Sequence, residues 1–251
     1  MAQQKGILPL RGTIGNITFY KSKDGYLARE KGGIDAKRIA TDPAFQRTRE
    51  NGMEFGRSGK AGKLLRNAVR QLLQNASDSK MVSRLTREMI KVIQADAVNP
   101  RGLRNVIDGE AELLEGFEFN ITGKLQTTLF APYSCSIDRI AGTLSVNLPA
   151  FVPSNMIGAP SGATHFRINS AELEVDFEQG VYVSEISIPT DIALNNEDTA
   201  PLAITHSVTP NSSKPLFILL GIEFYQQVNN AMYPLKNGAF NALAIIKVSG
   251  V

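Results

Sequence analysis

The spacing of apolar residues changes near residue 109, and this change limits the folds open to the chain. Before it, apolar side chains recur every three or four positions, as in amphipathic helices. After it, they alternate with polar side chains between turn residues, as in strands. We therefore expect an α+β protein with an N-terminal β-hairpin arm at residues 1–40, a basic helical hairpin at 41–109 and an antiparallel, β-sandwich-like domain at 110–251.

The helical part carries clear start signals. Residues 41–43 read Thr-Asp-Pro, in which a short polar side chain can cap the first free amides and proline suits the first turn. Helical spacing then continues to about residue 75. A second start at 77–79 (Ser-Asp-Ser) predicts a helix that ends by Asn99-Pro100. Two amphipathic helices joined by a short turn predict an αα-hairpin.

Four glycines recur at helical spacing in the first of these segments. They are Gly52, Gly56, Gly59 and Gly62. Each glycine costs a helix about 1 kcal/mol relative to alanine, so their repetition needs an explanation. One hypothesis is that another backbone or helix comes very close to this stripe, which makes the glycines assembly contacts. The other is that residues 52–62 form a loop or a broken helix.

The N-terminal segment is predicted to form a β-hairpin. Ile14, Ile17, Phe19 and Tyr20 favour strands, and a second strand follows a turn that contains Asp24-Gly25. A lone two-stranded hairpin is marginally stable in water. We therefore expect the hairpin to dock on its own domain or on a neighbouring subunit.

Charge is divided unequally along the chain. Residues 1–109 hold 21 Lys or Arg and 10 Asp or Glu, whereas residues 110–251 hold 6 Lys or Arg and 14 Asp or Glu. This asymmetry favours either a nucleic acid partner or charge complementarity between subunits. If nucleic acid binds, the cations of the helices are the expected phosphate contacts. They are Lys60, Lys63, Arg66, Arg70, Arg84, Arg87 and Lys91.

One predicted strand, at residues 171–178, alternates apolar and acidic side chains. Its acidic positions are Glu172, Glu174, Asp176 and Glu178. Period-two alternation predicts a half-buried strand with the carboxylates on the outer face. That face is expected to be solvated and to discourage aggregation, or else to dock on the basic region of another subunit. A calcium site is disfavoured, because strand carboxylates lack the looped arrangement that calcium prefers.

The sequence contains no recognisable catalytic constellation. His165 and His206 are the two histidines and lie 41 residues apart, Cys135 is the single cysteine, and no Gly-x-Ser-x-Gly is present. Residues 56–63 (GRSGKAGK) resemble a phosphate loop superficially, but Arg57 stands where the first glycine is required. We therefore expect a protein that is not an enzyme and has no cofactor or metal site.

No apolar stretch has the length of a signal peptide or of a membrane span. Synthesis in the cytosol without an export signal is expected. A virion or an extracellular particle is the expected final location if the chain builds one.

A resemblance adds a family but no activity. Residues 12–20 (GTIGNITFY) and 26–29 (YLAR) resemble the opening of a group of uncharacterised proteins known mainly from Bacteroidota. Residues 45–49 (FQRTR) and 116–120 (GFEFN) are similar to that group as well. The resemblance implies a common plan of hairpin, basic helices and β domain, with no assigned function.

These observations favour a structural subunit of a repeating assembly, such as a phage-like particle, tail or filament. The expected partners are further copies of the chain, in a homo-oligomer or a larger assembly. The alternative is a nucleic-acid-binding or packaging protein that acts through the basic helices. A carbohydrate-binding domain has less support, because the chain contains no tryptophan.

Overall fold

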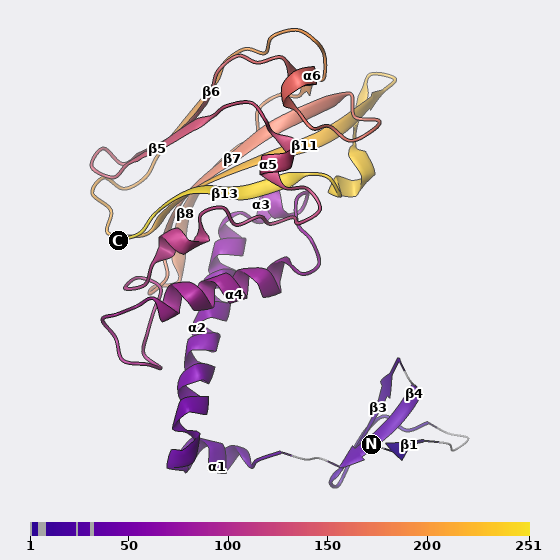
Figure 1. Ribbon diagram of the computed structural model, residues 1–251, viewed down its shortest axis with the longest axis vertical. Helices are drawn as coiled ribbons and strands as arrows, with labels where there is room; N and C mark the ends of the chain where they lie inside the picture. Colours follow the sequence, from indigo (N-terminus) through magenta and orange to yellow (C-terminus); the bar gives the residue numbers. More distant parts are fainter. Residues whose placement is uncertain (1, 5–8, 24, 31–32) are drawn as a thin grey trace. The chain divides into compact units, whose positions relative to one another are not determined.

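A computed structural model describes residues 2–4, 9–23, 25–30 and 33–251, and the elements are labelled in Figure 1. The helices are α1 (Ala36–Thr41), α2 (Gln46–Ala68), α3 (Arg70–Leu73), α4 (Met81–Gln94), α5 (Leu125–Thr128) and α6 (Pro153–Met156), with 3-10 turns η1 (Pro43–Phe45), η2 (Ala111–Leu114) and η3 (Leu235–Gly238). The strands are β1 (Ala2–Gln3), β2 (Gly12–Ile14), β3 (Ile17–Ser22), β4 (Gly25–Glu30), β5 (Ser134–Asp138), β6 (Thr143–Leu148), β7 (His165–Asp176), β8 (Val181–Ser187), β9 (Ile192–Ala193), β10 (Leu202–Ser207), β11 (Leu216–Val228), β12 (Ala231–Pro234) and β13 (Ala242–Ser249). The predicted mixture of helices and antiparallel sheets is confirmed.

The chain divides into two units, Met1–Arg49 and Glu50–Val251, which we describe separately. The first unit contains a four-stranded antiparallel sheet in the order β1-β4-β3-β2, followed by α1 and η1. Strands β3 and β4 pair with Tyr20 opposite Leu27, while Asp24 of the predicted turn lies outside the described residues. The described part thus has two more strands than the two that the sequence indicated.

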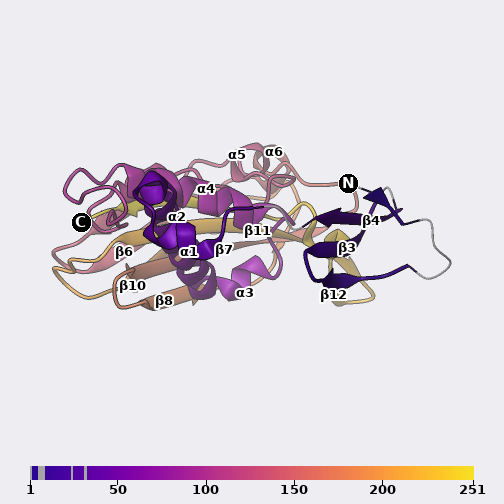
Figure 2. The ribbon, with the colours of Figure 1, turned by 90° about the horizontal axis from the view of Figure 1, so that it is seen from below.

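The start signal at Asp42 acts as expected, whereas α4 has Lys80 as its N-cap residue without a side-chain capping bond, and Asp78 lies in the turn before it. The Asp42 carboxylate accepts a hydrogen bond from the Ala44 amide at 2.9 Å, and Asp78 accepts one from the Lys80 amide at 2.7 Å. Helix α2 then runs unbroken for 23 residues and is seen nearly end-on in Figure 2. Among the described residues, no helix has both the length and the apolar character that a membrane crossing requires.

A first apolar core lies between the helices and one face of a six-stranded sheet. Leu65 of α2 and both Leu85 and Met89 of α4 pack in one cluster with Leu173 of β7 and Phe217 of β11. Figure 1 shows α4 on one side of β7, β11 and β13, with β5 and β6 on the other side. The helical region therefore shares its core with the β-rich region, which differs from the boundary expected at residue 109.

A second apolar core lies on the opposite face of the same sheet. The six-stranded sheet contains β12, β11, β7 and β8 in that order, with β13 also paired to β11 and β9 to β7. A three-stranded sheet, β10-β6-β5, contributes residues such as Leu144 and Val146 to a cluster that includes Phe166 and Phe224. Strand β7 is therefore covered on both faces, and most of its acidic side chains are buried as a result.

Candidate assembly site

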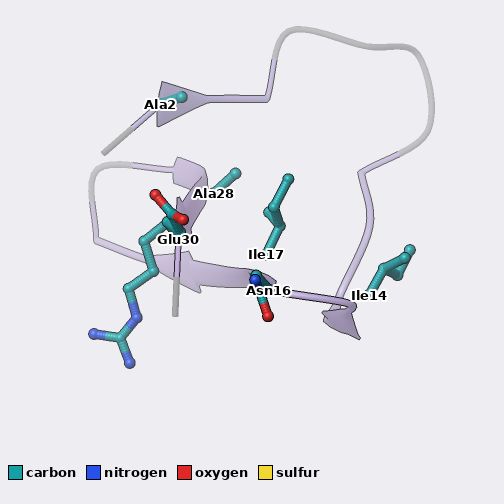
Figure 3. A pocket seen from close by; sticks show the side chains of 7 residues that line it. Ala2, Ile14, Asn16, Ile17, Ala28 and Glu30 are labelled. Atoms are coloured by element: carbon teal, nitrogen blue, oxygen red, sulfur yellow. The ribbon is translucent and has the colours of Figure 1, made fainter. Parts of the chain in front are cut away.

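One face of the N-terminal sheet is largely apolar and exposed. The register places Ile14, Ile17, Phe19, Ala28 and Ala2 on the same face, together with Tyr26, Lys21 and Glu30 toward the other end of the hairpin strands. Ile14 is 64% exposed and Ile17 is 45% exposed, and none of the described residues of Met1–Arg49 is buried. The face forms a shallow hollow of about 660 Å³, in which Ile17 and Ala28 point to the same side of the sheet (Figure 3). This sheet lacks a core of its own.

The other face of this sheet is more polar, although Leu27 also lies on it opposite Tyr20. The Arg29 guanidinium lies 5.4 Å from the ring centre of Tyr20, and the Thr13 and Thr18 hydroxyls are 3.3 Å apart. Cross-strand contacts of this kind contribute modestly to a sheet. Of the four predicted arm contacts, Ile14, Ile17 and Phe19 therefore share the apolar face, whereas Tyr20 lies on the polar one.

The glycine stripe lies in an unbroken helix, so the loop hypothesis is wrong. A Cβ atom added to Gly62 would contact Leu85 of α4 at 3.6 Å, an ordinary packing distance. A Cβ atom on Gly52, Gly56 or Gly59 would meet no described atom within 4 Å. Close packing within the chain therefore involves only Gly62 among the four, and the other three leave an open surface on α2.

Arg84 does not face outward as the sequence predicted. Its guanidinium forms an ion pair with Asp78 and donates hydrogen bonds to the carbonyls of Glu118 and Phe119, and it lies 5.2 Å from the ring centre of Phe117. All of these contacts lie within the chain, and they hold α4 against the segment at residues 117–119. The guanidinium is therefore not available to a phosphate.

The remaining helical cations differ in their availability. Arg87 and Lys91 are exposed but both pair with Glu88, at 2.9 and 2.6 Å. Burial lowers the pKa of Arg66, whose Nη1 atom has no hydrogen-bond partner among the described residues. Three cations of the predicted set are exposed and form no ion pair within the described part of the chain. They are Lys60, Lys63 and Arg70.

The acidic row of β7 is not a solvated outer face, and that prediction is wrong for three of its four members. Glu172, Glu174 and Asp176 are buried, because β10 and the segment that follows it cover this face; Glu178, beyond the end of β7, is exposed. Glu174 accepts hydrogen bonds from the Ser212 hydroxyl at 2.6 Å and the Thr209 amide at 3.1 Å. Asp176 pairs with Lys214 at 2.6 Å.

These partners explain the ionisation of the row. Burial raises the pKa of Glu174, but the hydrogen bonds from Ser212 and Thr209 outweigh it and leave the pKa below its usual range. The amides of Gln179 and Glu178 and the Lys214 ammonium lower the pKa of Asp176. Both carboxylates are therefore stabilised in their charged form by the chain itself, and neither is free to dock on another subunit.

Glu172 behaves differently. It is 1% exposed, its Oε1 atom has no hydrogen-bond partner among the described residues, and burial together with the nearby Glu185 carboxylate raises its pKa to about 8. His206 of β10 lies between the two carboxylates, with Nε2 3.1 Å from Glu172 and Nδ1 2.6 Å from Glu185. Only the contact with Glu185 is a hydrogen bond, because Nε2 has no hydrogen-bond partner among the described residues. The cluster brings β7, β8 and β10 together, and its members lie too far apart in the sequence to be predicted as neighbours.

Strand β8 is an open edge on the same side. It pairs with β7, and no described residue pairs with its other edge. Val181 is 58% exposed and Val183 is 52% exposed, with Tyr182 between them also exposed. Residues 168–213, which include β8, contain no Lys or Arg and eight Asp or Glu. That cation-free stretch is the sequence signal that would have drawn attention to this edge.

Two further polar features lie apart from these surfaces. Burial raises the pKa of the Cys135 thiol, and no set of three His, Cys, Asp or Glu side chains is placed to hold a metal ion among the described residues. A hollow of about 490 Å³ beside α2 is lined partly by Arg57, but this guanidinium already donates to the carbonyls of Gly102 and Arg104.

In comparisons with known proteins, no family model, no curated protein and no solved structure matches this chain. The resemblance of residues 12–20 to the Bacteroidota group stays a prediction.

Proposed function

We propose that the protein is a structural subunit of a repeating assembly, such as a phage-like particle, tail or filament, in which residues 1–40 form an arm that contacts a neighbouring copy. The observation that carries this proposal is the N-terminal sheet, whose described strands expose an apolar face and contain no buried residue. The hairpin of β3 and β4 is the centre of this arm. The two facing sheets of Glu50–Val251 form its sandwich-like body.

The energetics favour a partner for the arm. Fully burying an exposed isoleucine side chain stabilises by roughly 1.5–3 kcal/mol. Because Ile14 is 64% and Ile17 45% exposed, covering both supplies about 2–3 kcal/mol to an association. A small sheet without a core is marginally stable alone. Contact with a neighbour therefore stabilises the sheet and joins the subunits at once.

Charge supports the same arrangement. Residues 1–49 hold ten Lys or Arg against four Asp or Glu, whereas residues 110–251 are predominantly acidic. Opposite charges on two surfaces steer association and disfavour wrong partners. An arm and a body of opposite sign are suited to each other in a chain that assembles with itself. The proposed final location of the protein is the assembled particle, either a virion or an extracellular particle.

The test is the mass of the protein in solution with and without the arm. Deletion of residues 2–33 removes β1 to β4 and keeps α1 and the body, which has its own two cores. The full chain should form a species of several subunits, and the deletion should convert it to a folded monomer. An unchanged oligomer after the deletion would show that the arm is not the contact.

A pair of substitutions gives a matched control. Ile14→Lys with Ile17→Lys places two cations on the apolar face, and Gln3→Lys with Thr18→Lys places two on the other face of the same sheet. Only the first pair should disrupt the assembly. Equal effects of both pairs would point to added charge as the cause and would count against the apolar face.

The alternative function is nucleic-acid binding or packaging. Lys63, Arg66 and Arg70 follow one another at helical spacing with Lys60 nearby, and three of these four cations are exposed. Phosphate contacts of this kind give an affinity that falls steeply with salt. Lys63→Ala with Arg70→Ala should then weaken binding to a duplex at low salt, while Arg87→Ala with Lys91→Ala should have a smaller effect because both are paired with Glu88. Binding that does not change with salt would exclude this function.

A further inference from the structure

The edge of β8 carries one charged residue, Glu185, and has no proline, bulge or paired strand on its outer side among the described residues. Natural edges carry inward charges, prolines, bulges or a covering segment. Val181, Tyr182 and Val183 are exposed in succession, and β8 pairs regularly with β7 over seven residues. The opposite side of the sheet is better protected, because Phe117 and Phe119 exchange backbone hydrogen bonds with β13. Strand β12, at that side, is short and ends at Pro234.

The charge around β8 selects a basic partner. Glu178 and Glu185 are exposed next to the valines, and the nearest Lys or Arg in the sequence on either side are Arg167 and Lys214. Both of those cations are engaged, Arg167 with Asp191 and Lys214 with Asp176. A strand that pairs with β8 therefore meets apolar side chains and two exposed carboxylates, of which Glu185 already contacts His206.

The N-terminal sheet offers a strand of the required kind. Strand β2 is the outer strand of that sheet and pairs only with β3 among the described residues, so its other edge is open. It carries Ile14 and Thr13, both exposed, and follows directly on Arg11. Backbone pairing supplies affinity in such strand additions, and the flanking side chains supply specificity.

We propose that β2 of one copy adds to the β8 edge of a second copy, so that the arm's sheet continues the six-stranded sheet of its neighbour. This inference rests on the proposed function and names the surface that receives the arm. Each copy then gives one arm and receives another. Such a head-to-tail contact closes into a ring or continues as a filament.

A second copy is the favoured occupant rather than the chain's own arm. Tyr182 of β8 donates a hydrogen bond to the Asn67 carbonyl of α2. Asn67 lies 21 residues after Gln46, the first residue of α2, which is about 32 Å along the helix. Docking within one chain requires the arm to return along nearly the whole length of α2, whereas docking between copies carries no such requirement.

The experiment is a proximity test in the full-length chain with Cys135→Ser. Thr13→Cys is combined with Val183→Cys in one protein and, as the matched control, with Tyr233→Cys of β12 in another; Val183 and Tyr233 are similarly exposed, at 52% and 56%. Both proteins are treated with a short bis-maleimide crosslinker, and the products are separated under denaturing conditions. Covalent dimers and longer ladders are expected from the Val183 protein, at roughly tenfold the yield of the Tyr233 control.

Three other results overturn the inference. Equal ladders from both proteins mean that the crosslinks do not report β8. A crosslink that mass spectrometry finds within one chain means that the arm docks on its own body. No crosslink in a protein that still assembles by light scattering means that the arm binds elsewhere, while the proposed function stands. A protein that is monomeric before crosslinking contradicts the proposed function itself.

A second pair of variants covers the case in which cysteines disturb assembly. Val181→Lys with Val183→Lys alters the exposed β8 edge, and Val228→Lys with Tyr233→Lys adds the same charge at the β11–β12 end. Only the β8 pair should weaken self-association, by roughly tenfold or more, with circular dichroism unchanged in both. Equal association of the two variants also overturns the inference.

Discussion

Replacement of Glu172 by glutamine should change how stability depends on pH. Burial raises the pKa of Glu172 from 4.5 to about 8, with a further contribution from Glu185. Between these two pH values the folded chain keeps a proton on Glu172 that the unfolded chain has lost. Stability from this group is therefore fully present below pH 4.5 and is lost as pH rises toward 8.

The magnitude follows from the shift. One pKa unit corresponds to about 1.4 kcal/mol, so the free energy of unfolding falls by about 1.4 kcal/mol per pH unit through this window. The full difference reaches about 5 kcal/mol. Glutamine has nearly the same shape and stays neutral, so Glu172→Gln should remove this slope and make the variant the more stable protein at pH 8 and above.

The assay is urea unfolding of wild type and variant, followed by circular dichroism from about pH 5 to pH 9. The difference between the two proteins cancels the shared groups that do not contact Glu172, including Glu174 and Asp176, whose lowered pKa values act in more acid solution. His206 lies 3.1 Å from Glu172 and does not cancel, so the same comparison is repeated with His206→Asn in both proteins. Glu185→Gln should shrink the window, because it removes one cause of the raised pKa. Glu197→Gln, at an exposed site, serves as a control. Parallel curves for wild type and Glu172→Gln would refute the reasoning.

Two further predictions concern stability. Arg84→Ala should lower the free energy of unfolding by about 2–4 kcal/mol, because it leaves Asp78 and two carbonyls without their partner. Arg87→Ala, on the exposed side of the same helix, should change it by less than about 0.5 kcal/mol. Urea unfolding measures both. Gly56→Ala with Gly59→Ala should stabilise the subunit by about 1–2 kcal/mol, because an added Cβ atom meets no described atom at either position of this helix. If the same variant loses assembly by light scattering, the glycine stripe is a contact between copies.

Features set by neighbouring residues were predictable from the sequence. The cap at Asp42, the helices that follow it and strands such as β6, β8, β11 and β13 arise from local spacing and turn chemistry. Local patterns also indicated a strand at β7, with apolar and acidic residues on opposite faces. These elements were expected because their causes lie within a few residues of one another.

The placement of the acidic face was not predictable, because its cause is remote. Period-two alternation shows that Glu172 and Glu174 share a face but not what covers it. The covering groups, His206, Ser212 and Lys214, lie more than 30 residues later and reach β7 only when the second sheet folds over it. Arg84 is a similar case, since its partners at Glu118 and Phe119 follow 34 and 35 residues later.

The most direct test of the structural role is the mass of the untagged, full-length chain by size-exclusion chromatography with light scattering at physiological salt. Absorbance is recorded at the wavelengths of both protein and nucleic acid. The proposed assembly predicts a species of many times the 27.3 kDa chain mass, free of nucleic acid, that disappears when residues 2–33 are deleted. A small species that carries nuclease-sensitive absorbance would favour the packaging alternative. A monomer at every concentration would contradict the assembly.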